Sequence, residues 1–174
     1  MPIRVPAAPG PSPRSANMRA NRRRDTTLEL EVRSRLHEKG LRYRVDHPIR
    51  LEDRRTIRPD IVFTRLRICV ELDGCWWHGC EVCGRRETKA NRNYWSPKIA
   101  RNKERDAEQT AALEASAWTV LRFWEHEGPD AIAAAVEARV EQARASLADT
   151  STRGSRARRR SRSSGATRTL TRRG

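Results

Sequence analysis

The chain has 174 residues, of which 37 are basic and 22 acidic, and its formal net charge is +15. That length suits one domain with short additions, and its core is large enough to fold without disulfides. No apolar run reaches the length of a membrane span and the N-terminus lacks an apolar signal-peptide region, so the sequence predicts an intracellular protein that binds a polyanion, most commonly nucleic acid.

The charge is concentrated at the two ends of the chain. Residues 1–24 contain six arginines and residues 151–174 contain nine, and neither segment contains an acidic residue, whereas residues 25–150 are balanced. Low-complexity Pro, Ala, Ser and Arg composition cannot bury apolar surface. We therefore expect the following organisation: a disordered segment 1–16, a folded domain 17–148 that begins with a basic arm 17–25, and a disordered Arg/Ser-rich tail 149–174. The tail either attracts phosphates non-specifically or is a solvated appendage.

The order of elements follows from caps and periodicity. A capping box at Thr26–Glu29 opens an apolar i, i+4 pattern that ends at Gly40, which predicts a helix. Strand-like and helix-like runs follow along the chain. The predicted strands cover 41–45, 60–64, 68–73 and 117–124, the predicted helices cover 98–115 and 130–147, and the segments 46–59 and 74–95 are expected to be loops. This alternation predicts an α/β domain with a mixed sheet flanked by helices.

Three cysteines lie in the second of these loops. Cys80 and Cys83 form a Cys-x2-Cys pair, and Cys75 lies five residues upstream, which predicts a structural zinc site. Free thiols are the alternative, but exposed cysteines oxidise. The fourth ligand is either His78 or His126, and spacing alone leaves both open. If His126 binds the metal, His78 is a free imidazole suited to general-base catalysis.

Acidic residues occur at the ends of two predicted strands. Asp60 opens one strand, and Glu71 and Asp73 share a face of the next because side chains alternate along a strand. Carboxylates at neighbouring strand ends are natural Mg²⁺ ligands. The alternative interpretation is that these acids only solvate the sheet edge.

The tryptophans divide into two groups. Trp118 and Trp124 belong to an apolar strand and are expected in the core, as is Cys69. No core periodicity accounts for the aromatics in or beside the loop: Trp76, Trp77, Tyr94 and Trp95. Aromatics beside basic residues suit stacking on bases or wedging between base pairs, although they also suit a miniature core over the metal.

A series of motifs runs in one order from about residue 17 to residue 127. They are Asn17-Met-Arg-Ala-Asn, Arg24-Asp-Thr-Thr-Leu-Glu29, Arg58-Pro-Asp-Ile-Val62, Asp73-Gly-Cys-Trp-Trp-His-Gly-Cys80, Tyr94-Trp-Ser-Pro-Lys-Ile-Ala-Arg-Asn102, Arg105-Asp106 and Trp118-Thr-Val-Leu-Arg-Phe-Trp-Glu-His126. Together they resemble the very-short-patch-repair (Vsr) family of DNA mismatch endonucleases. The resemblance implies a restriction-endonuclease-like fold and Mg²⁺-dependent nicking of the T-containing strand, 5′ of the T of a T·G mismatch left by deamination of 5-methylcytosine.

The resemblance also implies roles for individual residues. Asp60 is expected to bind Mg²⁺, His78 to act as the base for water, and Glu29 to join the active site as well as to cap its helix. The implied Zn²⁺ ligands are Cys75, Cys80, Cys83 and His126. The implied DNA contacts are the wedge residues Trp76, Trp77 and Trp95, the polar residues Lys98 and Asn102, and the arm residues Arg19, Arg22, Arg23 and Arg24.

The expected partners are mismatched double-stranded DNA, a cytosine-5 methyltransferase, and a repair polymerase and ligase. The protein is expected to be a monomer and to act in the bacterial cytoplasm, at the nucleoid. The Glu-x-Lys motif common in restriction nucleases is absent because Glu71-Leu72-Asp73 has no lysine, which leaves the roles of Glu71 and Asp73 open. Two alternatives remain: a restriction-like nuclease of other specificity, and a non-catalytic, zinc-stabilised DNA-binding module.

Overall fold

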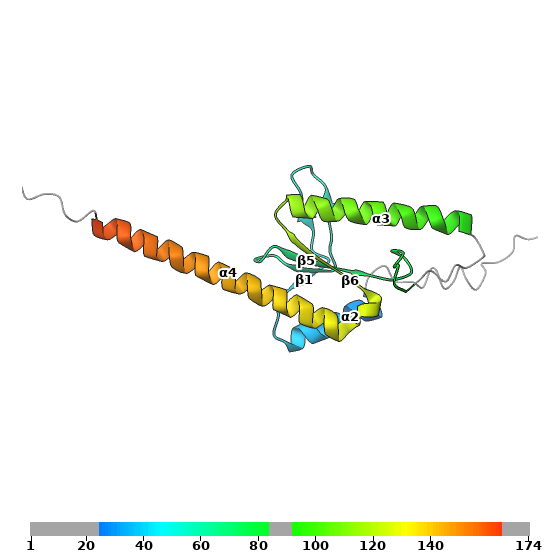
Figure 1. The fold of residues 1–174 in the computed structure, drawn as a ribbon, viewed down its shortest axis with the longest axis horizontal. Coiled ribbons are helices and arrows are strands. Elements are labelled where there is room, and N and C mark those ends of the chain that lie inside the picture. Colours follow the sequence, from blue (N-terminus) through cyan, green and yellow to red (C-terminus); the bar gives the residue numbers. More distant parts are fainter. Residues whose placement is uncertain (1–24, 84–91, 165–174) are drawn as a thin grey trace, which may run out of the picture.

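The computed structural model describes residues 25–83 and 92–164 (Figure 1). Three helices, six strands and one 3₁₀ turn make up this part of the chain. In chain order they are α2 (Thr27–Glu38), β1 (Arg44–Val45), β2 (Ile49–Arg50), β3 (Thr56–Ile57), β4 (Ile61–Phe63), β5 (Ile68–Asp73), α3 (Arg92–Ala115), β6 (Thr119–Trp124), η1 (Glu125–Glu127) and α4 (Pro129–Ser164).

Four strands form one mixed sheet in the order β1-β4-β5-β6. The pairs β1–β4 and β4–β5 are antiparallel, whereas β5 and β6 are parallel and are joined through α3. A parallel pair needs such a crossover because its strands begin at the same edge. The register places Glu71 opposite Arg122 and Asp73 opposite Trp124. The predicted mixed sheet with flanking helices is confirmed.

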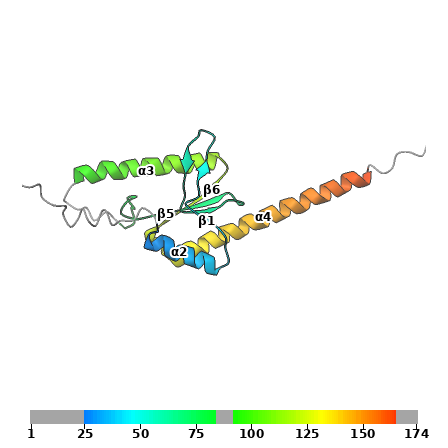
Figure 2. The same cartoon turned by 180° about the vertical axis from the view of Figure 1, so that it is seen from behind.

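The helices cover the two faces of this sheet. Figures 1 and 2 show α3 over one face and the pair α2 and α4 over the other. Side-chain alternation divides the core accordingly. The core beneath α2 and α4 contains Val32, Leu36, Ile61, Phe63, Ile68, Val70, Ile132, Val136 and Val140. The core beneath α3 contains Ile49, Leu51, Ile57, Val62, Cys69 and Leu113, so the prediction that Cys69 is a core residue is confirmed.

The ends of α2 follow the sequence signals. The Thr26 hydroxyl accepts a hydrogen bond from the backbone N–H of Glu29 and donates one to the Glu29 carboxylate. After the last turn, Gly40 adopts a left-handed φ of 71°, and the N–H of Leu41 bonds back to the carbonyl of Leu36. Glycine takes this conformation without a Cβ penalty, so it ends the helix where the sequence predicts.

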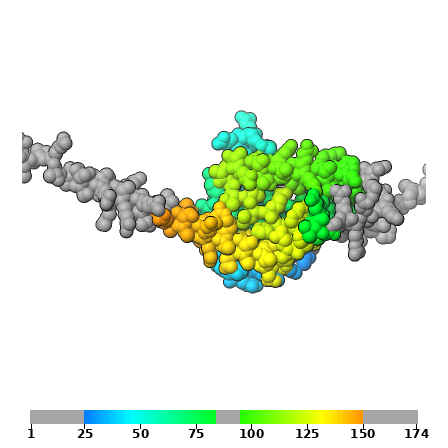
Figure 3. All heavy atoms as spheres, in the orientation of Figure 1, coloured from blue at the N-terminus to red at the C-terminus, as the bar shows by residue number. Residues whose placement is uncertain are grey.

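Two elements differ from the sequence expectation. The segment expected to be a loop contains the antiparallel hairpin β2–β3, which projects beyond α3 (Figure 3). The hairpin is stabilised by its apolar side chains Ile49, Leu51 and Ile57, which pack beneath α3 against Leu113. Helix α3 begins at Arg92 rather than at residue 98, and Pro97 lies in its second turn, where it has no N–H to donate to the backbone of the preceding turn.

The last helix is longer than expected. Helix α4 continues beyond residue 147 to Ser164, so residues 149–164 of the segment expected to be disordered are helical. The Ala- and Arg-rich sequence contains good helix formers and no proline after Pro129, which permits the extension. The expectations for 1–16 and for 165–174 lie outside the described residues. No helix in the described ranges is long and apolar enough to cross a membrane.

Candidate active site and metal centre

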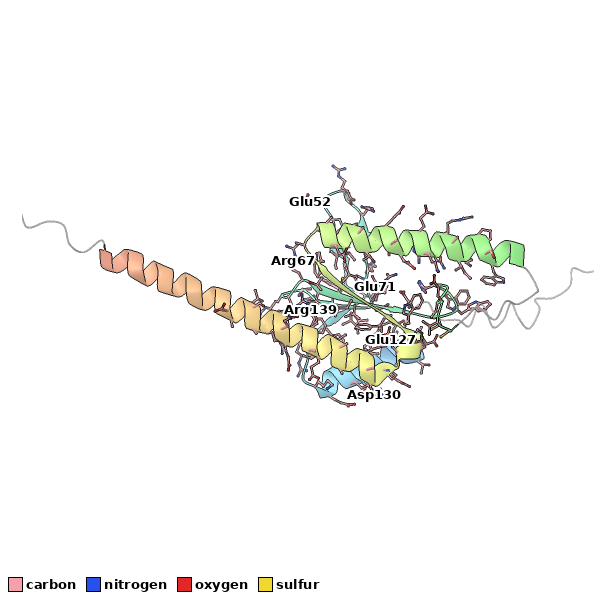
Figure 4. All side chains as sticks on the ribbon, viewed as in Figure 1. Glu52, Arg67, Glu71, Glu127, Asp130 and Arg139 are labelled. Carbon is pink, nitrogen blue, oxygen red and sulfur yellow. The ribbon has the colours of Figure 1, made fainter. Side chains whose placement is uncertain are left out.

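Three carboxylates converge where β4 begins and β5 ends. Asp60 immediately precedes β4, and its Oδ2 accepts a hydrogen bond of 2.7 Å from the backbone N–H of Leu72 on β5. Glu71 and Asp73 flank Leu72 and point to the face covered by α3, where Figure 4 shows Glu71 beneath that helix. The strand-end cluster that the sequence predicts is therefore formed, and it is covered by a helix.

Burial raises the pKa of two of these carboxylates and so favours their protonated form. Burial raises the pKa of Asp60 to about 6, and the negative charges of Glu29 and Asp73 raise it further. The hydrogen bond from the Leu72 N–H acts in the opposite direction and lowers this pKa. Burial and the charge of Asp60 raise the pKa of Glu71 to about 8, although Arg122 opposes them. Crowded carboxylates that retain protons become ionised when a divalent cation is present. Oxygen ligands are those that Mg²⁺ prefers, so Asp60 and Glu71 fit such an ion.

Glu29 lies beside this cluster and is fully engaged. Only 4% of it is exposed, and its carboxylate accepts hydrogen bonds from the N–H of Asp25 (3.1 Å), the hydroxyl of Thr26 (3.1 Å) and the guanidinium of Arg33 (2.5 Å). Its negative charge contributes to the raised pKa of Asp60, which places it near the proposed ion. The capping role is confirmed, and a role in the active site remains a prediction.

His78 is fixed by carboxylates through one ring nitrogen. Its Nδ1 lies 2.6 Å from Oδ2 of Asp106 on α3 and 3.3 Å from Oδ1 of Asp73. Arg122 bridges the two acids, with NH1 at 3.2 Å from Asp73 and 3.6 Å from Asp106, and Arg105 binds the outer oxygen of Asp106 at 2.9 Å. Although burial opposes it, the hydrogen bonds from Arg105 and His78 lower the pKa of Asp106, which therefore remains ionised.

The structure brings Asp106 and Arg122 into the site, although the sequence had assigned neither residue a role there. Asp106 lies seven residues after the buried Ile99 and seven before the buried Leu113, so it occupies the inward face of α3. An acidic residue within the apolar face of a predicted helix could have indicated that Asp106 is buried near the site. In the same way, Arg122 is a charged residue within the apolar run of β6. The three groups Asp73, His78 and Asp106 also have the donor atoms and proximity to hold a cation.

The three loop cysteines meet His126, not His78. His126 Nδ1 lies 3.3 Å from Cys75 Sγ and 3.4 Å from Cys80 Sγ, and the sulfurs of Cys75 and Cys83 are 3.5 Å apart. All four ligand atoms lie within 4.8 Å of one another. Three thiols and one imidazole at this separation have the composition of a tetrahedral structural zinc site.

The thiols differ in their pKa values. The N–H of Cys83 donates a hydrogen bond of 3.5 Å to the sulfur of Cys80 and lowers the pKa of Cys80. The hydrogen bond between the thiols of Cys83 and Cys75 raises the pKa of Cys83 to about 11. A cation among the sulfurs would release that proton. Glu125 of η1 also accepts a hydrogen bond of 3.2 Å from the N–H of Cys75, so the loop is attached to the end of β6.

The loop tryptophans form one cluster with the start of α3. The ring centroids of Trp76 and Trp77 lie 6.2 and 5.7 Å from that of Trp95, and Lys98 Nζ lies 5.4 Å from the Trp95 ring. Asn102 donates a hydrogen bond of 3.0 Å to the carbonyl of Trp77, so it fixes the loop. The three rings are half-buried, and each therefore has both a packed and an accessible part.

The two strand tryptophans are only partly in the core. Trp118 packs against the core beneath α3 and lies 5.6 Å from the guanidinium carbon of Arg67. Trp124 is half-buried and belongs to neither core cluster. The expected DNA contacts of the basic arm, Arg19, Arg22, Arg23 and Arg24, lie outside the described residues.

Comparison with known proteins identifies the family that this chain resembles. A family model described as DNA mismatch endonuclease Vsr matches residues 9–84. The type II nicking enzyme V.NaeI of Lentzea aerocolonigenes is 49% identical over 131 residues, which are 75% of this chain and 78% of that enzyme. The type II nicking enzyme V.XorIIP of Xanthomonas oryzae pv. oryzae is 38% identical over 75% of this chain and 90% of its own length. The DNA mismatch endonuclease Vsr of Escherichia coli is 34% identical over 64% of this chain and 69% of its own length.

Proposed function

The chain belongs to the Vsr family of DNA mismatch endonucleases, and from that premise we propose that it nicks the T-containing strand of duplex DNA 5′ of a T·G mismatch. The observation that carries the proposal is the meeting of two different groups at one sheet end. A pair of carboxylates, Asp60 and Glu71, lies next to Asp73, which contacts the imidazole of His78. The first group suits a cation at a phosphate, and the second suits proton transfer from water.

The imidazole is oriented for a base. Because the ionised Asp106 lies 2.6 Å from Nδ1, that nitrogen carries the proton and donates it, which leaves Nε2 as the acceptor. A water that hydrogen-bonds Nε2 can lose its proton as it attacks the phosphorus, and such general-base assistance contributes about 10²–10⁴-fold. Arg122 contacts both Asp73 and Asp106 and offsets part of the repulsion between the two acids.

Mg²⁺ would be held by Asp60 and Glu71, where it supplies a Lewis acid for the phosphate oxygens. By holding the cation, these two side chains would offset the repulsion between the acidic site and the phosphate. Glu29 adds a third negative charge near Asp60 and strengthens cation binding without needing direct coordination.

The aromatic cluster supports selection of a mismatch. Trp76, Trp77 and Trp95 lie next to the His78 loop, and Lys98 brings a positive charge to the same surface. Insertion of a ring between base steps requires unstacking, which costs less at a wobble pair than at a Watson–Crick pair. The site with Cys75, Cys80, Cys83 and His126 would hold Zn²⁺ and keep this loop rigid.

A second candidate is strand nicking in a restriction context without strict mismatch dependence. The relative with 49% identity bears the name of a type II nicking enzyme, which favours this alternative. A non-catalytic DNA-binding module is less suitable because it gives no role to the ordered His78–Asp106 pair. Proposed partners are a cytosine-5 methyltransferase, which generates the methylated base, and the polymerase and ligase that complete repair at the bacterial nucleoid.

A strand-specific nicking assay tests the proposal. Purified protein and Mg²⁺ are incubated with end-labelled duplexes that carry T·G or T·A at one position in several sequence contexts. We expect a single nick 5′ of the mismatched T, and its loss in Asp60→Asn with DNA binding retained. The control is Asp53→Asn in the exposed β2–β3 turn, which should cut normally. Equal cutting of T·G and T·A duplexes would favour the second candidate.

The basic arm provides a separate test of how the protein binds DNA. Removal of residues 1–24 deletes six arginines, which would release counterions from the duplex on binding. We expect weaker binding and a smaller dependence of the affinity on salt. Unchanged affinity and salt dependence would show that the arm does not contact DNA.

A further inference from the structure

A recess lined by arginines lies at the end of the sheet opposite the carboxylate cluster. It has a volume of about 450 Å³ and is bounded by β1, the turn after β4, and α4. Asp60 precedes β4, whereas the β4 residues that line the recess are Val62 and Phe63, towards the other end of the strand, so the two sites lie at opposite ends of β4. Four arginines line it, and none of its lining residues is acidic: Arg42, Arg44, Arg65 and Arg144.

The floor of the recess is apolar and held in place by the core. Tyr43 and Phe63 form an edge-to-face pair with centroids 6.0 Å apart, and the Tyr43 hydroxyl donates a hydrogen bond of 2.8 Å to the carbonyl of Arg33. Leu66 packs against the same core cluster. On the rim, Leu147 of α4 is 54% exposed. A preformed floor of this kind binds an apolar side chain without the cost of ordering it.

The arginines around this floor are available to a ligand. All four are exposed, and none of their guanidinium groups makes a hydrogen bond or ion pair with another residue in the ranges 25–83 and 92–164. Other arginines of the fold, such as Arg33 and Arg122, are paired with acids. Unpaired guanidinium groups on both sides of one recess create a positive potential that attracts carboxylates or phosphates.

We propose that this recess binds an acidic segment of a partner protein that inserts a leucine-like side chain onto the apolar floor. A phosphate backbone would use the arginines but leave Tyr43, Leu66 and Leu147 without a complementary surface. The terminal segments of this chain do not fit either, because residues 1–24 and 165–174 contain no acidic residue. An acidic segment with an apolar anchor complements both the charge and the floor.

The test uses the full chain and fluorescein-labelled peptides at about 0.1 M salt, where charges more than about 10 Å apart are largely screened. One peptide alternates pairs of glutamates with leucines, and the other has serine in place of leucine. The recess variant combines Arg42→Glu with Arg65→Glu. Its control reverses two exposed arginines of the β2–β3 hairpin, Arg50→Glu with Arg54→Glu, for the same change in net charge.

We expect the recess variant to lower affinity for the leucine peptide at least about tenfold, and the hairpin control to lower it by less than about threefold. Leu147→Asp should also weaken binding, whereas Leu30→Asp, at a leucine of similar exposure on α2, should not. Nicking by these variants should stay normal, since the recess lies away from Asp60.

Three results would overturn the proposal. Equal losses in the recess and hairpin variants would show attraction by net charge alone. Equal affinity for the leucine and serine peptides would show that the apolar floor has no ligand. Loss of duplex DNA binding in the recess variant, with peptide binding intact, would make this surface a nucleic-acid contact.

Discussion

Oδ2 of Asp106 lies 2.6 Å from Nδ1 of His78 and joins the middle of α3 to the loop that follows β5. The two residues are 28 positions apart in the chain, and Asp106 is 6% exposed. The pair selects one tautomer of the imidazole and fixes the direction of its other nitrogen. The same contact couples the position of α3 to the chemistry of the loop.

Asp106→Asn should therefore impair the base without removing it. An asparagine can present its NH₂ group to Nδ1, which favours the tautomer with the proton on Nε2, and that nitrogen can no longer accept a proton from water. We expect nicking to fall by about 10²–10³-fold while DNA affinity and thermal stability change little. Single-turnover nicking at saturating enzyme measures the effect, and Asp53→Asn is the control. A variant with normal single-turnover rates would remove Asp106 from the mechanism.

The carboxylate cluster makes stability depend on pH. Burial raises the pKa of Glu71 to about 8 from an ordinary value of 4.5, so the folded protein retains a proton that the unfolded chain has released at intermediate pH. The contribution of Glu71 to stability without added Mg²⁺ should then be fully present below about pH 4.5 and should be lost as pH rises through about 8. Asp60, with its pKa raised to about 6, acts in the same direction.

Glu71→Gln should remove part of that dependence. At about pH 8.5 we expect the variant to be more stable than the wild type by on the order of 1–3 kcal/mol, and at about pH 5 by much less. Thermal unfolding across pH measures the difference, with the exposed Glu52→Gln as the control. Glu71→Gln should also nick poorly at limiting Mg²⁺. An identical pH profile of stability in the variant and the wild type would contradict the assigned burial of the charge.

The tryptophans should separate function from stability. Trp95→Ala removes the ring against which Trp76 and Trp77 pack, and we expect T·G nicking to fall about tenfold or more, in line with a loss of about 1–3 kcal/mol per stacked base. Trp118→Ala removes a ring packed on the core beneath α3, so it should cost about 2 kcal/mol of stability with nicking retained below its Tm. The reverse pattern would make Trp95 only structural.

Much of the architecture could be predicted because local signals agreed with the global fold. The capping box at Thr26, the glycine after α2, and the strand patterns of β4 and β5 each depend on residues close in sequence. The same patterns placed Asp60, Glu71 and Asp73 at adjoining strand ends. The hairpin β2–β3 could not be predicted in this way because its two-residue strands are stabilised by Leu113 and Val62, which lie elsewhere in the chain.

The details of the site depend on long-range contacts that spacing does not encode. His126 and His78 were both possible fourth ligands, and the choice depends on β6 ending beside the cysteine loop. The role of Asp106 depends on which face of α3 meets the sheet. Both choices are made by tertiary packing, which overrides local pattern.

The cysteine site makes a prediction about metal and folding together. The purified chain should contain one zinc per molecule, and its removal by a chelator should lower the free energy of unfolding by several kcal/mol, because a structural ion binds only the folded loop. Cys83→Ser should lower zinc content and free the loop that carries His78, so that nicking falls as well. Cys69→Ala is the matched control: this thiol is in the core beneath α3, away from the cluster, so zinc should remain at one per molecule with only a packing loss. Elemental analysis and thermal unfolding measure both quantities. A zinc-free protein with unchanged stability and nicking would leave Cys75, Cys80, Cys83 and His126 without a structural role.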